Sequence, residues 1–221
     1  MKYGTTAGVL KPLDQVMQPD PRFKIHVIEN ESGIRPFQLE DIHQRLCLTK
    51  LNDEVPQDVR TQFHTAINLM LYAWFVFEFQ TVAEHHAYAT LEFALRTRFP
   101  EATKKIIRKK REVIEPLTLG PLLRLALEKG VILAERLPAW ERVKANRKFY
   151  EECSPFPLAP MPAAKEWLDQ VAETIPDFRN ALAHGKPKLY LHGSFWALEL
   201  CADLINALFP IAHEKCETTN K

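Results

Sequence analysis

The sequence predicts an all-α fold: a helical bundle with a mostly extended N-terminal arm and a helical insertion. Long stretches carry apolar residues at helical spacing, and prolines separate these stretches. The 221 residues include seven glycines, and 46% of them are hydrophobic, which is enough for a substantial core. Lys and Arg total 29 against 28 for Asp and Glu, so the near-neutral balance argues against a protein that coats nucleic acid by bulk charge.

The arm is assigned to residues 1–57 and includes one short helix. Residues 23–28 alternate in polarity like a short strand, and nearby prolines interrupt anything longer. Two interpretations stay open: an arm docked on the body or on a partner subunit, and a loosely ordered tail. The short helix is expected over 39–51.

The helical bundle is assigned to residues 58–215, with 216–221 as a C-terminal tail. Apolar positions follow helical spacing from 59 to about 79 and again from 82 to 99, where Pro100 ends the pattern. No proline or glycine interrupts this stretch, so one long helix and two shorter ones are both compatible with it.

The middle of the bundle, about 101–162, reads as an insertion. Its expected elements are a basic helix over 102–113, two short helices over 122–129 and 139–152, and a rigid proline-rich link over 155–162. Three further helices are expected over 163–174, from Pro176 to Gly185, and from Ser194 as N-cap to about His213.

The segment from Asp177 to Gly185 is the most informative part of the chain. Pro176 suits the first position of a helix, Asp177 then falls in its first turn, and Gly185 suits a left-handed C-cap. Arg179 and His184 would therefore share one rigid segment. A fixed cation beside a group that titrates near neutral pH is suitable for phosphate chemistry.

The string Arg179-Asn180-Ala-Leu-Ala-His184-Gly185 resembles the motif of HEPN domains, the "higher eukaryotes and prokaryotes nucleotide-binding" superfamily. That motif is an Arg, four to six residues and a His, often with a polar residue directly after the Arg. The resemblance covers roughly residues 58–215 and includes the Leu-Glu-x-Ala-Leu-Arg stretch that ends at Arg96. It implies a HEPN-like helical bundle.

The resemblance further implies a metal-independent endoribonuclease that acts as a homodimer, as a defence or toxin protein. A neutral His184 would take the ribose 2′ proton, and its protonated counterpart would supply a proton to the leaving oxygen. Arg179 would hold the nonbridging oxygens, and Asn180 would orient a phosphate or the imidazole. The products would be a 2′,3′-cyclic phosphate and a 5′-hydroxyl.

Helical geometry favours a site shared by two chains. Arg179 lies about 140° from His184 around an ideal helix, while Asp177, Asn180 and His184 line one stripe. Lys186 and Lys188, in the following loop, are expected to contact RNA. A basic run that includes Lys104, Lys105 and Arg108 is a further candidate for RNA contact, and a solvated face balanced by glutamates is the alternative.

A non-catalytic interpretation competes with the enzyme. His184 would then cap a helix, Arg179 would bridge to Asp177 or Glu92, and the domain would bind nucleotide, RNA or another protein. Some HEPN toxins whose antitoxin is a nucleotidyltransferase carry a Tyr two positions after the His. Lys186 stands there, so control through such a Tyr is not expected, and an antitoxin or another regulatory protein would act differently.

No cofactor and no metal ion are expected. Adjacent His85 and His86 do not form a chelate on a helix, although either could approach the motif. The four scattered cysteines form no CxxC pair, the tryptophans read as packing anchors, and the most apolar run is too short to span a bilayer. A cytoplasmic protein with RNA and a second copy of itself as partners is therefore expected.

Overall fold

The computed structural model of the chain describes residues 10–30, 33–108, 111–185 and 191–211; for residues 30, 105–108, 111–113 and 191–192 it describes the backbone alone. The described residues are mostly helical, which confirms the predicted all-α class. The helices are α1 (Leu39–Leu48), α2 (Gln57–Tyr72), α3 (Phe79–Arg98), α4 (Leu119–Glu128), α5 (Pro138–Cys153), α6 (Ala164–Ala183) and α7 (Leu191–Leu208). Two hairpins and three short 3-10 helices join them: β1 (Val27–Asn30) with β2 (Gly33–Pro36), β3 (Thr103–Arg108) with β4 (Arg111–Pro116), η1 (Leu13–Gln15), η2 (Pro21–Ile25) and η3 (Ala134–Arg136).

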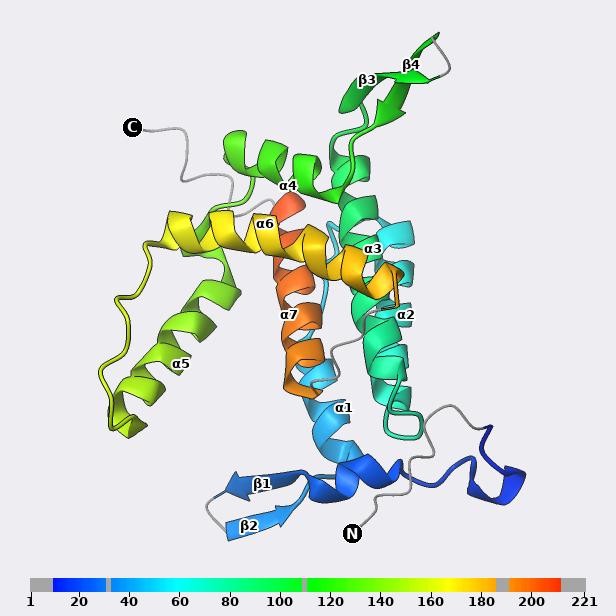
Figure 1. Cartoon of the computed structure of the whole chain (residues 1–221), viewed down its shortest axis with the longest axis vertical. Helices are drawn as coiled ribbons and strands as arrows, with labels where there is room; N and C mark the ends of the chain where they lie inside the picture. Colours follow the sequence, from blue (N-terminus) through cyan, green and yellow to red (C-terminus); the bar gives the residue numbers. More distant parts are fainter. Residues whose placement is uncertain (1–9, 31–32, 109–110, 186–190, 212–221) are drawn as a thin grey trace.

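Helix α3 is the centre of the bundle. It packs most extensively against α2 and then against α7, and α6 crosses α7 to end beside α3 (Figure 1). Its buried residues lie on more than one side, as a helix covered by several neighbours requires; they include Ala83, Ala87, Leu91, Ala94 and Leu95. The predicted core stripe of the last helix is also confirmed, with Ala197, Leu200, Cys201, Leu204 and Leu208 all buried.

Residues 59–99 form two helices rather than one. Helix α2 ends at Tyr72, and α3 begins at Phe79 after a turn without proline or glycine. The arm binds this turn: the Asp20 N–H donates to the Trp74 carbonyl at 2.8 Å, and Arg22 pairs with Glu78 at 2.7 Å. The carbonyl of Trp74 is thus used outside the helix, which fits a break at this point.

The arm is docked on the body of its own chain. Phe23 is 2% exposed, and its ring lies 4.9 Å from that of Trp74 and 5.3 Å from that of Phe77. The loosely ordered tail is therefore wrong for the segment from Asp20 to Ile25. The expected strand over 23–28 is displaced, because η2 occupies its first residues and only Val27–Asn30 pairs with β2.

The basic helix expected over 102–113 is wrong, because this segment forms the β3–β4 hairpin. Its sequence is rich in β-branched residues, which favour strands. A helix would also stack Lys104 on Arg108 and Lys105 on Lys109 at i,i+4, with like charges facing. The hairpin sets Lys104 opposite Glu115, and only its last pair, Arg108 and Arg111, brings like charges face to face among the described pairs.

The separate motif helix is also wrong. Helix α6 runs without interruption from Ala164 to Ala183, with Pro176 inside it, so Asp177 does not lie in a first turn. Ile175 is helical and buried. The proline ring packs against α4 at Gly120, where an added Cβ would come within 3.2 Å of Pro176 Cγ. Proline by itself favours the first turn of a helix, but packing against α4 holds the Pro176 ring at an internal position of α6.

The last helix begins earlier and ends earlier than expected. Helix α7 starts at Leu191, so Ser194 is an internal, buried residue instead of the N-cap, and the helix ends at Leu208. The helices expected over 39–51, 122–129 and 139–152 are confirmed within a few residues as α1, α4 and α5. No helix in the described part of the chain is both long and apolar enough to cross a membrane.

The predicted roles of the tryptophans and cysteines hold where the structure describes them. Trp140 and Trp167 pack together with ring centroids 5.3 Å apart, and both are buried. Cys47, Cys153 and Cys201 are free thiols, and burial raises the pKa of Cys201. Cys216 lies outside the described residues.

Candidate active site

The motif occupies the last two turns of α6. The N–H of His184, the C-cap residue, donates to the Asn180 carbonyl at 3.0 Å, and Gly185 takes a left-handed φ of 70°. The predicted glycine C-cap is confirmed. The stripe Asp177, Asn180 and His184 is exposed as expected, so the end of the helix presents polar groups to solvent.

Arg179 lies against α3 and pairs with Glu92. Its Nη2 lies 3.4 Å from Glu92 Oε2, and its Nη1 donates to Asn180 Oδ1 at 3.3 Å. The Glu92 side chain is only 8% exposed, whereas that of Arg179 is 35% exposed. Of the two acidic partners considered for Arg179, Glu92 is confirmed, and its burial fixes the position of the guanidinium.

Glu92 is shared between two arginines. Arg96 Nη2 donates to Glu92 Oε1 at 2.5 Å, so the predicted i,i+4 pair of α3 is confirmed. One buried carboxylate thus faces two guanidinium groups, and the three side chains together carry one excess positive charge. Because both arginines are partly exposed, this excess charge is open to an anion.

His85 approaches the same cluster from α3. It precedes Glu92 by seven residues, which places both on one face of the helix. Burial, the positive charge of Arg179 and the neighbouring His86 together lower the pKa of His85, which favours the neutral imidazole. The expectation that His85 or His86 nears the motif therefore holds for His85. Its electrostatic interaction with Arg179 depends on how α6 lies against α3, which no local pattern in the sequence encodes.

His184 stands apart from these groups. It is exposed, its ring has no hydrogen-bond partner among the described residues, and no hydrogen bond joins it to Arg179. This agrees with the wide angle between the two positions around the helix. The arginine cluster and the histidine of one chain thus do not form a closed site by themselves.

The residues predicted to contact RNA are spread more widely. Lys104 is exposed on β3, and Lys105 and Arg108 lie on the same strand. The β3–β4 hairpin projects from the body beyond the end of α3 (Figure 1). Lys186 and Lys188 lie outside the described residues. The structure therefore places the basic run on a protruding hairpin instead of a helix face.

The base of this hairpin is tied to the arginine cluster. The Leu117 N–H donates to the Ala102 carbonyl at 3.1 Å, which closes the hairpin. Arg96 Nε donates to the Leu117 carbonyl at 3.4 Å while its Nη2 binds Glu92. A continuous chain of contacts thus runs from the hairpin through Arg96 and Glu92 to Arg179.

Metal binding finds no support in the described part of the chain, where no three His, Cys, Asp or Glu side chains form a group that could hold an ion. Comparisons with protein-family models, with curated proteins and with solved structures give no match. The function is therefore inferred from the residues and their geometry.

Proposed function

We propose that this chain is a metal-independent endoribonuclease of HEPN type that cleaves RNA at a cleft formed by two copies of α6. The observation that carries the proposal is the sharing of buried Glu92 by Arg96 and Arg179. A cluster with one excess positive charge, held by a buried carboxylate, is suited to a scissile phosphate. The HEPN-like motif supplies the acid–base group.

The chemistry uses the ribose 2′-hydroxyl as the nucleophile. A neutral His184 removes the 2′ proton, the 2′ oxygen attacks phosphorus, and the 5′ oxygen leaves with a proton from the protonated His184 of the second chain. The Arg179 guanidinium binds the nonbridging oxygens, and Asn180 accepts a hydrogen bond from Arg179 at 3.3 Å, which orients it. RNA is cleaved to a 2′,3′-cyclic phosphate and a 5′-hydroxyl, while DNA is spared.

The separation of Arg179 from His184 supports a shared site. The guanidinium faces α3 and the imidazole faces solvent. A second chain related by a twofold axis can bring its own exposed His184 to the first chain's arginine cluster. A cytoplasmic toxin or defence protein, controlled by an antitoxin or another regulatory protein, is the biological role that accompanies this proposal.

The second candidate is a non-catalytic module that binds RNA, nucleotide or protein. The pairing of Arg179 with Glu92 favours it, because an arginine held by a carboxylate needs no substrate to explain it. The two candidates differ in whether His184 is required for turnover or only for binding.

The decisive experiment is cleavage of labelled single-stranded RNA by purified protein in the presence of a chelator. Arg179→Ala and His184→Ala should each lower the rate by about 100-fold or more. His64→Ala, at an exposed histidine of α2, is the matched control and should retain full activity. Intact RNA at high concentrations of folded, dimeric protein would contradict the enzyme and favour the binding module.

A mixing experiment tests the shared cleft. Parent chains mixed with an excess of His184→Ala chains and allowed to exchange subunits should lose activity as heterodimers form, because the shared cleft needs the His184 of both chains. A protein that stays monomeric at working concentration, or parent activity that survives full exchange, would contradict the dimeric site.

A further inference from the structure

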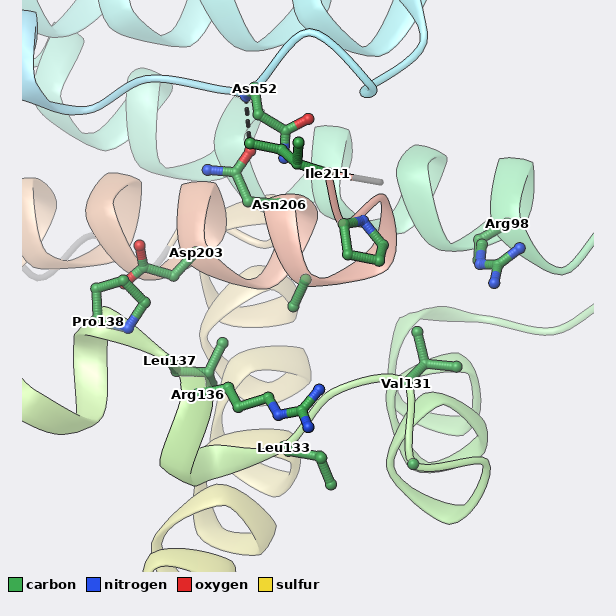
Figure 2. Close-up of a pocket in the computed structure, with 13 residues that line it drawn as sticks. Asn52, Arg98, Val131, Leu133, Arg136, Leu137, Pro138, Asp203, Asn206 and Ile211 are labelled. Carbon is green, nitrogen blue, oxygen red and sulfur yellow. Dashed lines mark hydrogen bonds between the residues drawn. The ribbon is translucent and has the colours of Figure 1, made fainter. Parts of the chain in front are cut away.

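A second pocket lies away from the Arg179 cluster. It opens where the C-terminal ends of α3 and α7 meet the segment between α4 and α5, and no residue of α6 lines it (Figure 2). Its volume of about 560 Å³ lies within the range of small-molecule sites.

Two arginines give this pocket its charge. Arg98, from the last turn of α3, and Arg136, from η3, extend their guanidinium groups into the space from different walls (Figure 2). Within the described part of the chain, neither arginine has an ion-pair or hydrogen-bond partner for its side chain. Asp203, the one carboxylate in the described lining, is bound by Arg142 at 2.6 Å. Among the described lining residues, the pocket therefore keeps two positive charges without a paired carboxylate.

The rest of the lining is partly apolar. Leu133 is 39% exposed and Ile211 is 46% exposed, which is high for large aliphatic side chains at a concave surface. Val131 extends the same apolar surface. Leu137, whose side chain is 2% exposed, forms the floor of the pocket. An apolar group placed here would remove water from these side chains without displacing any of them.

The wall formed by Asn52 and Asn206 is already fixed. The Asn52 N–H donates to Asn206 Oδ1 at 2.9 Å, and Asn52 Nδ2 donates to the Phe209 carbonyl at 3.1 Å. Asn206 Nδ2 donates to the Lys50 carbonyl at 3.0 Å. A preformed wall lowers the ordering cost that a ligand would meet on binding.

We propose that this pocket binds a small organic anion. Its phosphate or carboxylate lies between Arg98 and Arg136, and its apolar body covers Leu133 and Ile211. The two arginines favour an anion, and the exposed aliphatic surface favours an anion that carries an apolar part. Nucleoside monophosphates and fatty carboxylates share this chemistry, and the site does not depend on the ribonuclease proposal.

Titration calorimetry at low salt tests the proposal with three probes: adenosine 5′-monophosphate, dodecanoate and inorganic phosphate. At least one of the two organic anions should bind with a Kd below about 1 mM and at least about tenfold more tightly than inorganic phosphate. The organic probe that binds identifies the source, since one carries a flat base and the other an aliphatic chain.

Variants locate the binding site. Arg98→Ala and Arg136→Ala should each weaken the binding of that probe by about tenfold or more. Leu133→Ser should weaken the binding of the organic probe but not that of inorganic phosphate. Arg124→Ala, at an exposed arginine of α4, is the matched control and should change nothing. The proposal is overturned if no organic probe binds or if phosphate binds as tightly as the organic anions. It is also overturned if Arg124→Ala lowers the affinity for the organic probe as much as Arg98→Ala and Arg136→Ala do.

Discussion

Two glutamates of α3 that are two turns apart in sequence meet opposite electrostatic environments. Glu92 is buried beside Arg96 and Arg179, whereas the hydrogen bonds that Glu84 accepts from described residues come from neutral hydroxyls, those of Tyr88 at 3.1 Å and Ser194 at 3.4 Å. Burial raises the pKa of Glu84, and these two hydrogen bonds offset part of that effect. The sequence suggested Glu92 as a partner of Arg179, but the environment of Glu84 depends on a serine 110 residues away.

Glu84→Gln should stabilise the protein at neutral pH. The folded-state pKa of Glu84 is raised, so the folded state prefers the protonated carboxyl. The stability that this carboxyl contributes is present below pH about 4.3 and is lost as pH rises through the folded pKa. A glutamine amide stays neutral at every pH, so the variant does not lose this stability. We expect a higher Tm at pH 7, by about 2–4 °C for each kcal/mol, and little difference at pH 4.

Glu173→Gln, at an exposed position of α6, is the control for this variant. Thermal unfolding followed by circular dichroism at several pH values measures both proteins. A Glu84→Gln protein that is less stable than the parent at pH 7 would show that the carboxylate is better accommodated than its surroundings indicate.

Arg179→Ala should raise the pKa of His85. Both the loss of the arginine's positive charge and the greater access of water to the imidazole act in this direction. An NMR titration of the histidine ring protons should show His85 titrating below the usual value of about 6.5 in the parent and nearer to it in the variant. The exposed His64 serves as internal reference, and an unchanged His85 would place Arg179 too far away to act on it.

At the scale of elements, the period of the apolar residues predicted most helices, because their burial follows from spacing alone. The helix expected over 102–113 is wrong because a run of cations does not distinguish a helix from a hairpin. The β-branched residues of the segment favour strands, and Lys104 faces Glu115 across the hairpin. Pro176 failed as a start signal for a different reason. Its ring packs on Gly120, 56 positions earlier in the chain, and no local rule contains that contact.

Gly120→Val should destabilise the protein by about 1–3 kcal/mol. An added Cβ already comes within 3.2 Å of Pro176 Cγ, and the two further methyl groups would push α4 away from α6. Chemical denaturation measures the loss. The same substitution in a Pro176→Ala background should cost less, and an equal cost in both backgrounds would show that the proline ring is not the obstacle.

At the scale of the whole molecule, the arm makes the chain a single packed unit. Its Phe23 belongs to the same buried cluster as the helices, and Arg22 joins Asp20 to Glu78 across the connection between α2 and α3. The hydrogen bond from Arg22 lowers the pKa of Glu78. Burial alone would raise the pKa of Asp20, but hydrogen bonds from the Arg22 side chain and backbone lower it overall.

Acid should loosen the arm before the helices unfold. The folded-state pKa values of Asp20 and Glu78 are depressed, so their contribution is present above about pH 4 and is lost as pH falls through the depressed values. Arg22→Ala should destabilise the protein by about 1–3 kcal/mol and remove most of this acid dependence, because a buried carboxylate loses its cation. Arg124→Ala should do neither.

Trp74 fluorescence and amide exchange of residues 20–37 follow the arm in this experiment, since Trp74 contacts Phe23. Simultaneous loss of the arm and the helices on acidification, in both the parent and Arg22→Ala, would show that the ion pairs do not hold the arm independently.

The shared carboxylate of Glu92 couples two parts of the molecule mechanically. Arg96 donates one hydrogen bond to the base of the β3–β4 hairpin and another to Glu92, which also pairs with Arg179. A displacement of the hairpin would therefore also move the guanidinium of Arg179. Arg179 in turn acts electrostatically on His85. Replacing residues 103–116 with a short glycine–serine linker should therefore shift the His85 ring signals, and unaltered signals would show that the hairpin is not coupled to Arg179.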